Sequence, residues 1–485
     1  MRLEADRARL AREVHTTTGV EGAFDGARDA AAWVADAMGG ELTAEKCVGV
    51  AVLGHPRCQA AFWRLGMSSA DLVQSELFRN PTLALSLRLP DGGGLANVEA
   101  SIAQNLADLW QLPARRRVAA RAHDRALLDA AREIAAVAGQ ARAAFAEGAT
   151  AGRRVEIARE NRRVALQLTE LAVARQTAGA GSAIDVNLAR REALDAELAL
   201  RDAELAEIEA RHKLAGALGV EAAPESLRLV EPGVEESLAT LDVEALAGEA
   251  VAQRLDVRLA AAAIHEAEAA LVHARAQVFR SLEVGVGFER EARRRRDDRN
   301  LLAEAASASA DAGALALPSL APRERVATDV IVGPTLSAEL PVFDQNQAQI
   351  AKAGYALEAA RRDHEAVRRG AIQDVRLAAR RAQAAIERVR FHRDEALPLS
   401  ESSLLLARDA YRAGRAPFAA VLESQRQLLA ARAREADARR DAAVVQAALE
   451  AALGRPLAAP RRDSVRGQSE SSGRPSNSGE PGEGH

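Results

Sequence analysis

The sequence predicts a mainly helical fold with a small β part, in which long antiparallel helical hairpins accompany four short strands. Three observations support this prediction. The second half of the 485-residue chain repeats the first, long stretches contain no proline, and short segments alternate between apolar and polar residues. Hydrophobic residues make up 48% of the chain but aromatic residues only 3%, because alanine supplies much of the apolar count. Small residues let helices approach closely, so slender packed helices are expected instead of a thick globular core.

The repeat is visible as two constant shifts along the chain. Residues 179–187 (GAGSAIDVN) correspond to residues 414–422 (GRAPFAAVL), a shift of 414 − 179 = 235. Upstream, a shift of 241 − 42 = 199 lays residues 83–87 on residues 282–286. The difference, 235 − 199 = 36 residues, predicts an insertion in the second half. The predicted units are a leader at 1–41, a first structural repeat at 42–239, a second structural repeat at 240–458 and a disordered tail at 459–485.

The first repeat is predicted to contain a helix, a β-hairpin and a long helical hairpin. A helix over residues 42–78 must end before Pro81. Alternating residues at 82–89 and 97–105, joined by a DGGG turn, predict the β-hairpin. Residues 113–178 predict a helix roughly 100 Å long at its usual rise per residue. Gly179 and Gly181 then turn the chain into a returning helix with a coiled-coil seam of Leu194, Leu198, Leu205 and Ile208.

The second repeat is predicted to follow the same plan, with a helix over residues 241–279, two strands, and helices over 347–412 and 418–453. Pro398 should bend or locally unwind the first of these last two helices. The insertion, residues 291–326, opens with four consecutive arginines at 293–296 and then becomes rich in alanine and serine. This composition predicts a solvated loop between two strands.

The four predicted strands should have one apolar and one polar face. The apolar face would contain Leu83, Leu85, Leu87, Leu89, Val284, Val286, Phe288, Val330, Val332 and Leu336. The polar face would contain Ser86, Arg88, Glu99, Ser101, Gln104, Glu283 and Glu289. An apolar exterior around a polar interior is typical of a membrane β-barrel. Four strands cannot close a barrel, but three copies of the chain would supply twelve.

Charge and composition argue against several other classes of function. The 65 basic and 69 acidic residues are interspersed, which predicts solvated helix faces and no nucleic-acid-binding patch. The glycines at 92–94 lack the lysine of a phosphate loop, and His265 lacks the spacing of a metalloprotease. Cys47 and Cys58 lie about 16 Å apart along a helix, too far for a disulfide. We therefore expect no enzymatic activity, cofactor or resident metal, and the histidines His265 and His273 are interpreted as surface residues.

Five segments resemble the TolC-like family of outer-membrane efflux factors. They are residues 72–83 (LVQSELFRNPTL), 104–106 (QNL), 178–189 (AGAGSAIDVNLA), 340–347 (LPVFDQNQ) and 411–418 (YRAGRAPF). The resemblance covers about residues 42–456 and is nearest the heavy-metal cation efflux branch. It implies a homotrimer with a twelve-stranded barrel in outer-membrane lipid, an α-helical tunnel in the periplasm and an equatorial region near residues 220–241. It also implies two partners, a periplasmic adaptor (membrane fusion) protein and an inner-membrane pump of the resistance-nodulation-division type.

The resemblance also suggests functional residues at the ends of the helical hairpins. The tips that would dock the adaptor contain Gly179, Gly181, Ser182, Tyr411, Gly414 and Pro417. A candidate gate consists of Arg175, Asp185 and Arg412, in which three copies of the carboxylate would converge near the axis and attract cations. Asp185 could instead stabilise the start of its own helix. Because the second tip has Ala420 where the first has Asp185, an acidic constriction would contain few carboxylates.

The predicted function is therefore a passive export conduit for metal cations or small toxic compounds, the outer-membrane component of a tripartite efflux system. Two alternatives remain at this stage, a soluble coiled-coil scaffold and the periplasmic adaptor itself. The scaffold does not explain four alternating strands at equivalent points of two repeats, and the adaptor would not show the duplication. The residues after Met1 lack the apolar segment of a signal peptide, so either the true start lies upstream or the product is not exported. We expect the first, because the apolar strands would be a liability in the cytosol.

Overall fold

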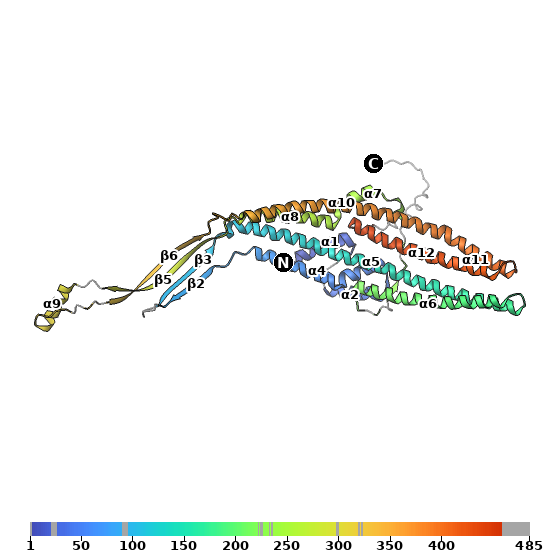
Figure 1. The fold of residues 1–485 in the computed structure, drawn as a ribbon, viewed down its shortest axis with the longest axis horizontal. Coiled ribbons are helices and arrows are strands. Elements are labelled where there is room, and N and C mark those ends of the chain that lie inside the picture. Colours follow the sequence, from blue (N-terminus) through green and yellow to red (C-terminus); the bar gives the residue numbers. More distant parts are fainter. Residues whose placement is uncertain are drawn as a thin grey trace, which may run out of the picture.

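The computed structural model describes residues 2–457 except 21–26, 90–95, 222, 224–226, 232, 234–235, 297–299, 319–320 and 322–323. The chain is strongly elongated, with a β-sheet at one end and two helical hairpin tips at the other (Figure 1). The predicted DGGG turn and the predicted disordered tail lie outside the described residues. None of the helices in the described part of the chain is long and apolar enough to cross a membrane.

Two long helical hairpins form most of the molecule, as predicted. In the first, α5 (Asp108–Thr177) runs for 70 residues and α6 (Ala183–Leu218) returns along it. In the second, α10 (Gln347–Phe391) continues through a π-helical turn (His392–Ala396) into α11 (Leu397–Arg412), and α12 (Phe418–Leu453) returns. The predicted local unwinding at Pro398 is confirmed, because the π turn lies immediately before α11 and Pro398 is in the first turn of that helix.

Residues related by the 235-residue shift occupy equivalent helices in the two repeats. Both returning helices have 36 residues, and their start points differ by 418 − 183 = 235. The glycines Gly179, Gly219, Gly414 and Gly454 all have φ between 69° and 73°, which is the left-handed conformation that favours glycine after a helix. The corresponding glycines therefore end equivalent helices, two in each repeat.

The shorter predicted helices are each divided in two. The segment predicted as one helix over residues 42–78 forms α3 (Ala44–Gly54) and α4 (Pro56–Ser75), because His55 precedes a proline and is extended at φ −68° and ψ 128°. Likewise α7 (Val243–Gln253) and α8 (Leu255–Ala276) are separated by Arg254, whose backbone is not helical. Its guanidinium group instead donates to Asp256 and Asp374.

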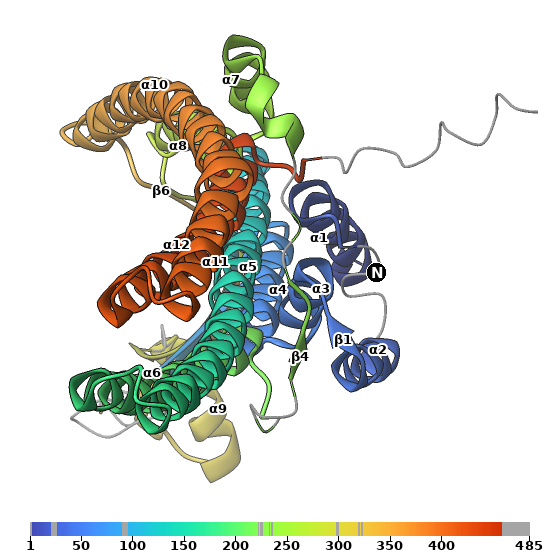
Figure 2. The ribbon, with the colours of Figure 1, turned by 90° about the vertical axis from the view of Figure 1, so that its right-hand side faces the viewer.

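The helices pack as a curved layer. Helices α4 and α6 both pack on one side of α5, while α8 and α12 lie between α5 and the α10–α11 helix. The predicted leader contains α1 (Arg2–Thr18) and α2 (Ala27–Gly39), which lie with α3 on the convex side of this layer (Figure 2). Leu10 and Val14 of α1 are fully buried, so this helix belongs to the packed core. Nearby, β1 (Glu41–Leu42) pairs in parallel with β4 (Arg228–Leu229), followed by a 3-10 helix (Glu236–Thr240).

The four predicted strands form one antiparallel sheet in the order β2-β3-β5-β6. They are β2 (Thr82–Arg88), β3 (Asn97–Asn105), β5 (Leu282–Arg296) and β6 (Glu324–Ala338). The register places Leu83 opposite Ile102 and Ile102 opposite Val286, so the apolar residues share one face. One residue was assigned to the wrong face: Gln104 lies opposite Val284 and so on the apolar face, because side chains alternate with a period of two.

The prediction of a solvated loop for the 36-residue insertion was wrong. Strands β5 and β6 continue as a two-stranded ribbon from Glu291 opposite Asp329 to Arg296 opposite Glu324. Helix α9 (Leu301–Ala312) follows at the end of this ribbon, at the extremity of the molecule in Figure 1. The side chains of the predicted arginine cluster at 293–296 lie outside the described residues, although their backbone belongs to β5.

Candidate functional site: the hairpin tips and the sheet–helix junction

Each tip is built by a helix that ends in a glycine turn. After α5, the Ala180 amide donates to the Arg175 carbonyl at 2.9 Å and the Gly179 amide to the Gln176 carbonyl at 3.0 Å. After α11, the Arg415 amide donates to the Ala410 carbonyl at 2.8 Å, which is the same bond shifted by 235 residues. This pattern is the Schellman motif, in which a left-handed residue lets the last carbonyls of a helix be satisfied.

Gly181 is also constrained, because a Cβ atom there would lie 3.0 Å from the Gln176 nitrogen and 3.1 Å from the Arg175 carbonyl carbon. The predicted tip residues therefore do form both chain reversals. Ser182 caps α6, whereas Pro417 begins α12 without a side-chain cap.

Asp185 takes part in the cap of α6. Its amide donates to the Ser182 hydroxyl at 3.2 Å, and its carboxylate accepts from the Ser182 amide at 3.5 Å, which together form a capping box. The carboxylate also acts on the neighbouring hairpin, since it contributes, after burial, to raising the pKa of Tyr411. Asp185 thus has the geometry of a helix cap and lies close to the contact between the two tips.

Arg175 joins the two hairpins. Its guanidinium group donates to the Tyr411 carbonyl, to the Arg412 carbonyl at 3.4 Å and to the Ala180 carbonyl at 3.1 Å. The same group lies over the Tyr411 ring, 4.4 Å from its centroid. Side chains of both hairpins form one apolar cluster beneath it, in which the Tyr411 and Phe418 rings are 5.3 Å apart. Arg412 differs, because its side chain is exposed and pairs with Asp409 of its own helix at 3.6 Å.

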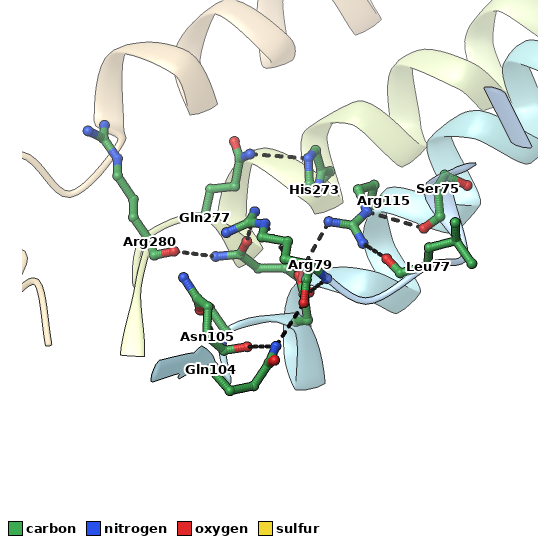
Figure 3. Close-up of polar contacts among 12 residues, drawn as sticks. Ser75, Leu77, Arg79, Gln104, Asn105, Arg115, His273, Gln277 and Arg280 are labelled. Carbon is green, nitrogen blue, oxygen red and sulfur yellow. Dashed lines mark hydrogen bonds and ion pairs between the residues drawn. The ribbon is translucent and has the colours of Figure 1, made fainter. Parts of the chain in front are cut away.

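A buried polar cluster, not predicted from the sequence, lies where the sheet meets the helices (Figure 3). The Asp108 carboxylate has no exposed side-chain surface and accepts from the Arg79 amide at 2.6 Å and from Arg115 at 3.3 Å. Arg115 also donates to the Ser75 and Leu77 carbonyls at the end of α4. These bonds satisfy the last carbonyls of α4 where the chain becomes extended toward β2.

Gln111 satisfies a backbone carbonyl at the corresponding helix-to-strand transition of the second repeat. Its amide nitrogen donates to the Phe279 carbonyl at 2.8 Å, between α8 and β5, while its oxygen accepts from Arg79 at 3.1 Å. Gln104 donates to the Arg79 carbonyl at 2.9 Å. Nearby, burial and the charges of Arg115 and Arg79 lower the pKa of His273, so its ring stays neutral at pH 7. The first turn of α5 therefore fixes both helix-to-strand transitions.

The described residues contain no group of three or more histidine, cysteine, aspartate or glutamate side chains that could hold a metal ion. His265 contacts Glu268 at 3.4 Å and His273 contacts Gln277 at 3.2 Å. Cys47 and Cys58 are free and buried, and burial raises the pKa of each thiol to about 12. The described polar clusters tie elements together by hydrogen bonds and ion pairs.

The arrangement of two long helical hairpins with a small sheet at one end also occurs in proteins of known structure. Residues 246–455 match the family described as outer membrane efflux protein. Solved structures with the same fold include the outer-membrane channel OprN (19% identity, TM-score 0.65, covering 87% of this chain and 91% of that chain). A second is CusC (18% identity, TM-score 0.65, covering 85% of this chain and 92% of that chain). A third is the outer membrane protein VceC from Vibrio cholerae (16% identity, TM-score 0.63, covering 85% of this chain and 96% of that chain).

A search among curated protein sequences finds no match. Residues 246–455 thus resemble the outer membrane efflux protein family, and the chain as a whole shares the fold of OprN, CusC and VceC.

Proposed function

We propose that this chain is the outer-membrane channel subunit of a tripartite efflux system and works as a homotrimer. Three copies would form a twelve-stranded barrel in the outer membrane and a helical tunnel in the periplasm, through which metal cations or small toxic compounds pass without chemical change. A periplasmic adaptor would dock at the tips, and an inner-membrane pump of the resistance-nodulation-division type would supply the energy. Such a conduit needs no catalytic group or cofactor.

The observation that carries the proposal is the exposed apolar face of the sheet. Leu83 and Leu85 are 77% and 73% exposed, and their partners across the sheet, Val286 and Phe288, are exposed as well. A soluble protein rarely leaves so continuous an apolar surface in water. The outer edges of β2 and β6 have no neighbour in the described part of the sheet. In a closed barrel, strands of further copies would pair with both edges, and lipid around the barrel would cover the apolar face.

The helical layer supports the same closure. One free edge, formed by α4 and α6, exposes Trp63 and Met67. The four residues predicted as a coiled-coil seam, Leu194, Leu198, Leu205 and Ile208, are exposed on α6 as well, so this seam is not packed within the subunit. The opposite edge, formed by α10 and α11, exposes Tyr355, Leu399, Leu405 and Leu406. Two different edges can meet only head to tail, and such a contact either closes into a ring or continues as a filament. Three strongly curved layers would close a ring.

The competing hypothesis is a soluble coiled-coil scaffold, which would explain the long helices but not the apolar sheet. The two hypotheses are separated by expressing the chain behind an export signal in an efflux-deficient Gram-negative host. The channel proposal expects a complex of three 51.4 kDa chains in the outer-membrane fraction and ion conductance in planar bilayers. Recovery as a soluble species without conductance would favour the scaffold and refute the channel.

A further inference from the structure

Helix α9 and the segment that follows it form a small unit at the far end of the β5–β6 ribbon, beyond the rest of the molecule (Figure 1). Asn300 caps the helix by accepting from the Ala303 amide at 3.1 Å, and Gly313 ends it at φ 60°. The Ser309 hydroxyl bonds to both the amide and the carbonyl of Ala316, so residues 313–317 fold back over one side of the helix. A 12-residue helix is marginal in water on its own, so α9 needs a further packing partner.

The surface of this unit shows what kind of partner it would take. Leu302, Leu315 and Leu317 are 85%, 93% and 86% exposed. Leu302, Ala306 and Ala310 are spaced four residues apart along α9 and are all exposed. A face of small residues beside exposed leucines suits close contact with another helix.

The position of α9 argues against hydrocarbon as the partner. The apolar face of the sheet extends from Leu282 to the level of Val330, which lies opposite Arg290. This is about 30 Å along the strand, or roughly 23 Å across a membrane at the usual tilt, and it matches the ~25 Å apolar band of outer-membrane barrels. Beyond it the ribbon adds six paired residues, about 20 Å, and these carry charges at consecutive positions. Helix α9 therefore lies well outside the apolar band.

The same dimensions bring three copies of α9 within reach of one another. A twelve-stranded barrel with strands ~4.8 Å apart and tilted by about 40° has a radius of roughly 12 Å. A ribbon about 20 Å long exceeds this radius, so each one can lean from the barrel rim to the threefold axis. We propose, on the basis of the trimeric channel above, that three α9 units pack against one another over the outer mouth and restrict the exit with their leucines.

Cysteine cross-linking tests this arrangement in the full-length protein. The native thiols of Cys47 and Cys58 are buried, and burial raises their pKa, so both react slowly and a new exposed cysteine is the one that reports. Ala306→Cys trimers in outer membranes should form disulfide-linked dimers on mild oxidation, whereas the wild-type chain should form none. The matched control adds Leu302→Asn, Leu315→Asn and Leu317→Asn to Ala306→Cys. These changes should abolish the dimers and raise single-channel conductance while the trimer persists.

Intact trimers of Ala306→Cys that yield no dimers would overturn the inference and leave the channel proposal standing. A second outcome would also refute the α9 contact. If Ala306→Cys forms no dimers, and lipopolysaccharide stays bound to the wild-type chain but is lost from the triple asparagine variant, the leucines contact the membrane surface instead. Absence of any trimer would refute the channel itself and this inference with it.

Discussion

Replacing Arg175 with alanine should open the closed end of the proposed channel. In each subunit this side chain provides two bonds from the first hairpin to carbonyls of the second, at Tyr411 and Arg412, and a ring contact at 4.4 Å. Hydrogen bonds from charged groups contribute about 1.5–3 kcal/mol when buried and less at this half-buried site. A cation–π contact at an exposed site adds about 0.5–1 kcal/mol.

The combined loss is therefore about 2–3 kcal/mol of coupling between the hairpins in each subunit. Because each 1.4 kcal/mol corresponds to a factor of ten, the closed-to-open equilibrium of one subunit should shift by roughly 30- to 150-fold. Arg175→Lys should recover only part of this coupling, since an ammonium group lacks the planar fork that reaches several carbonyls at once.

Single-channel recording in planar bilayers measures the effect, with sensitivity of cells to large antibiotics as a second readout. Arg175→Ala should conduct more, and the matched control Arg412→Ala should behave like the wild-type chain. The Arg412 side chain makes only an exposed ion pair within its own helix, and its backbone carbonyl, which Arg175 contacts, is kept. Wild-type conductance in Arg175→Ala trimers would refute the idea that this residue holds the tips together.

Three further predictions concern the sheet and the tips. Val284→Arg on the apolar face should cost about 2–4 kcal/mol and reduce assembled trimer, whereas Glu283→Arg on the other face should assemble normally; equal loss in both would contradict the assigned faces. Substituting valine for both Gly179 and Gly414 should strain each left-handed turn and abolish export while trimers persist, and normal export would argue against adaptor docking at the tips. Asp185→Ala should lower stability by about 0.5–1 kcal/mol in thermal unfolding, because it removes the capping box. A change in cation preference would in addition place Asp185 in the gate. If the variant keeps both its stability and its cation preference, both roles are excluded.

Much of the helical architecture could be predicted because glycine and proline act locally. The left-handed glycines of the two hairpin turns, Gly179 and Gly414, are the pair that the 235-residue shift had matched, and the π turn lies beside Pro398. The insertion was misassigned for the opposite reason. Residues 291–296 show no apolar alternation, and they form a strand only because residues 324–329, far along the chain, pair with them.

The polar cluster at the sheet–helix junction could not be predicted from the sequence either. Asp108 and Gln111 lie one turn apart on α5, which is a recognisable local feature. Their partners Arg79 and Phe279 come from segments 29 and 168 residues away, and nothing in the sequence indicates that these segments meet. Such a site becomes predictable only after the order of the helices in the layer is known.

The two repeats share a plan but differ in stiffness, and the difference has a consequence for the closed end. Helix α5 runs unbroken to its tip, whereas the corresponding α10–α11 helix is interrupted by the π turn that ends at Ala396. This turn lies 411 − 396 = 15 residues before Tyr411, or about 22 Å from the tip. A helix bends most easily where its regular hydrogen bonding is interrupted. Since Arg175 connects the stiff hairpin to the carbonyls at the end of the interrupted one, its removal should free the α11–α12 hairpin to move while α5–α6 keeps its position.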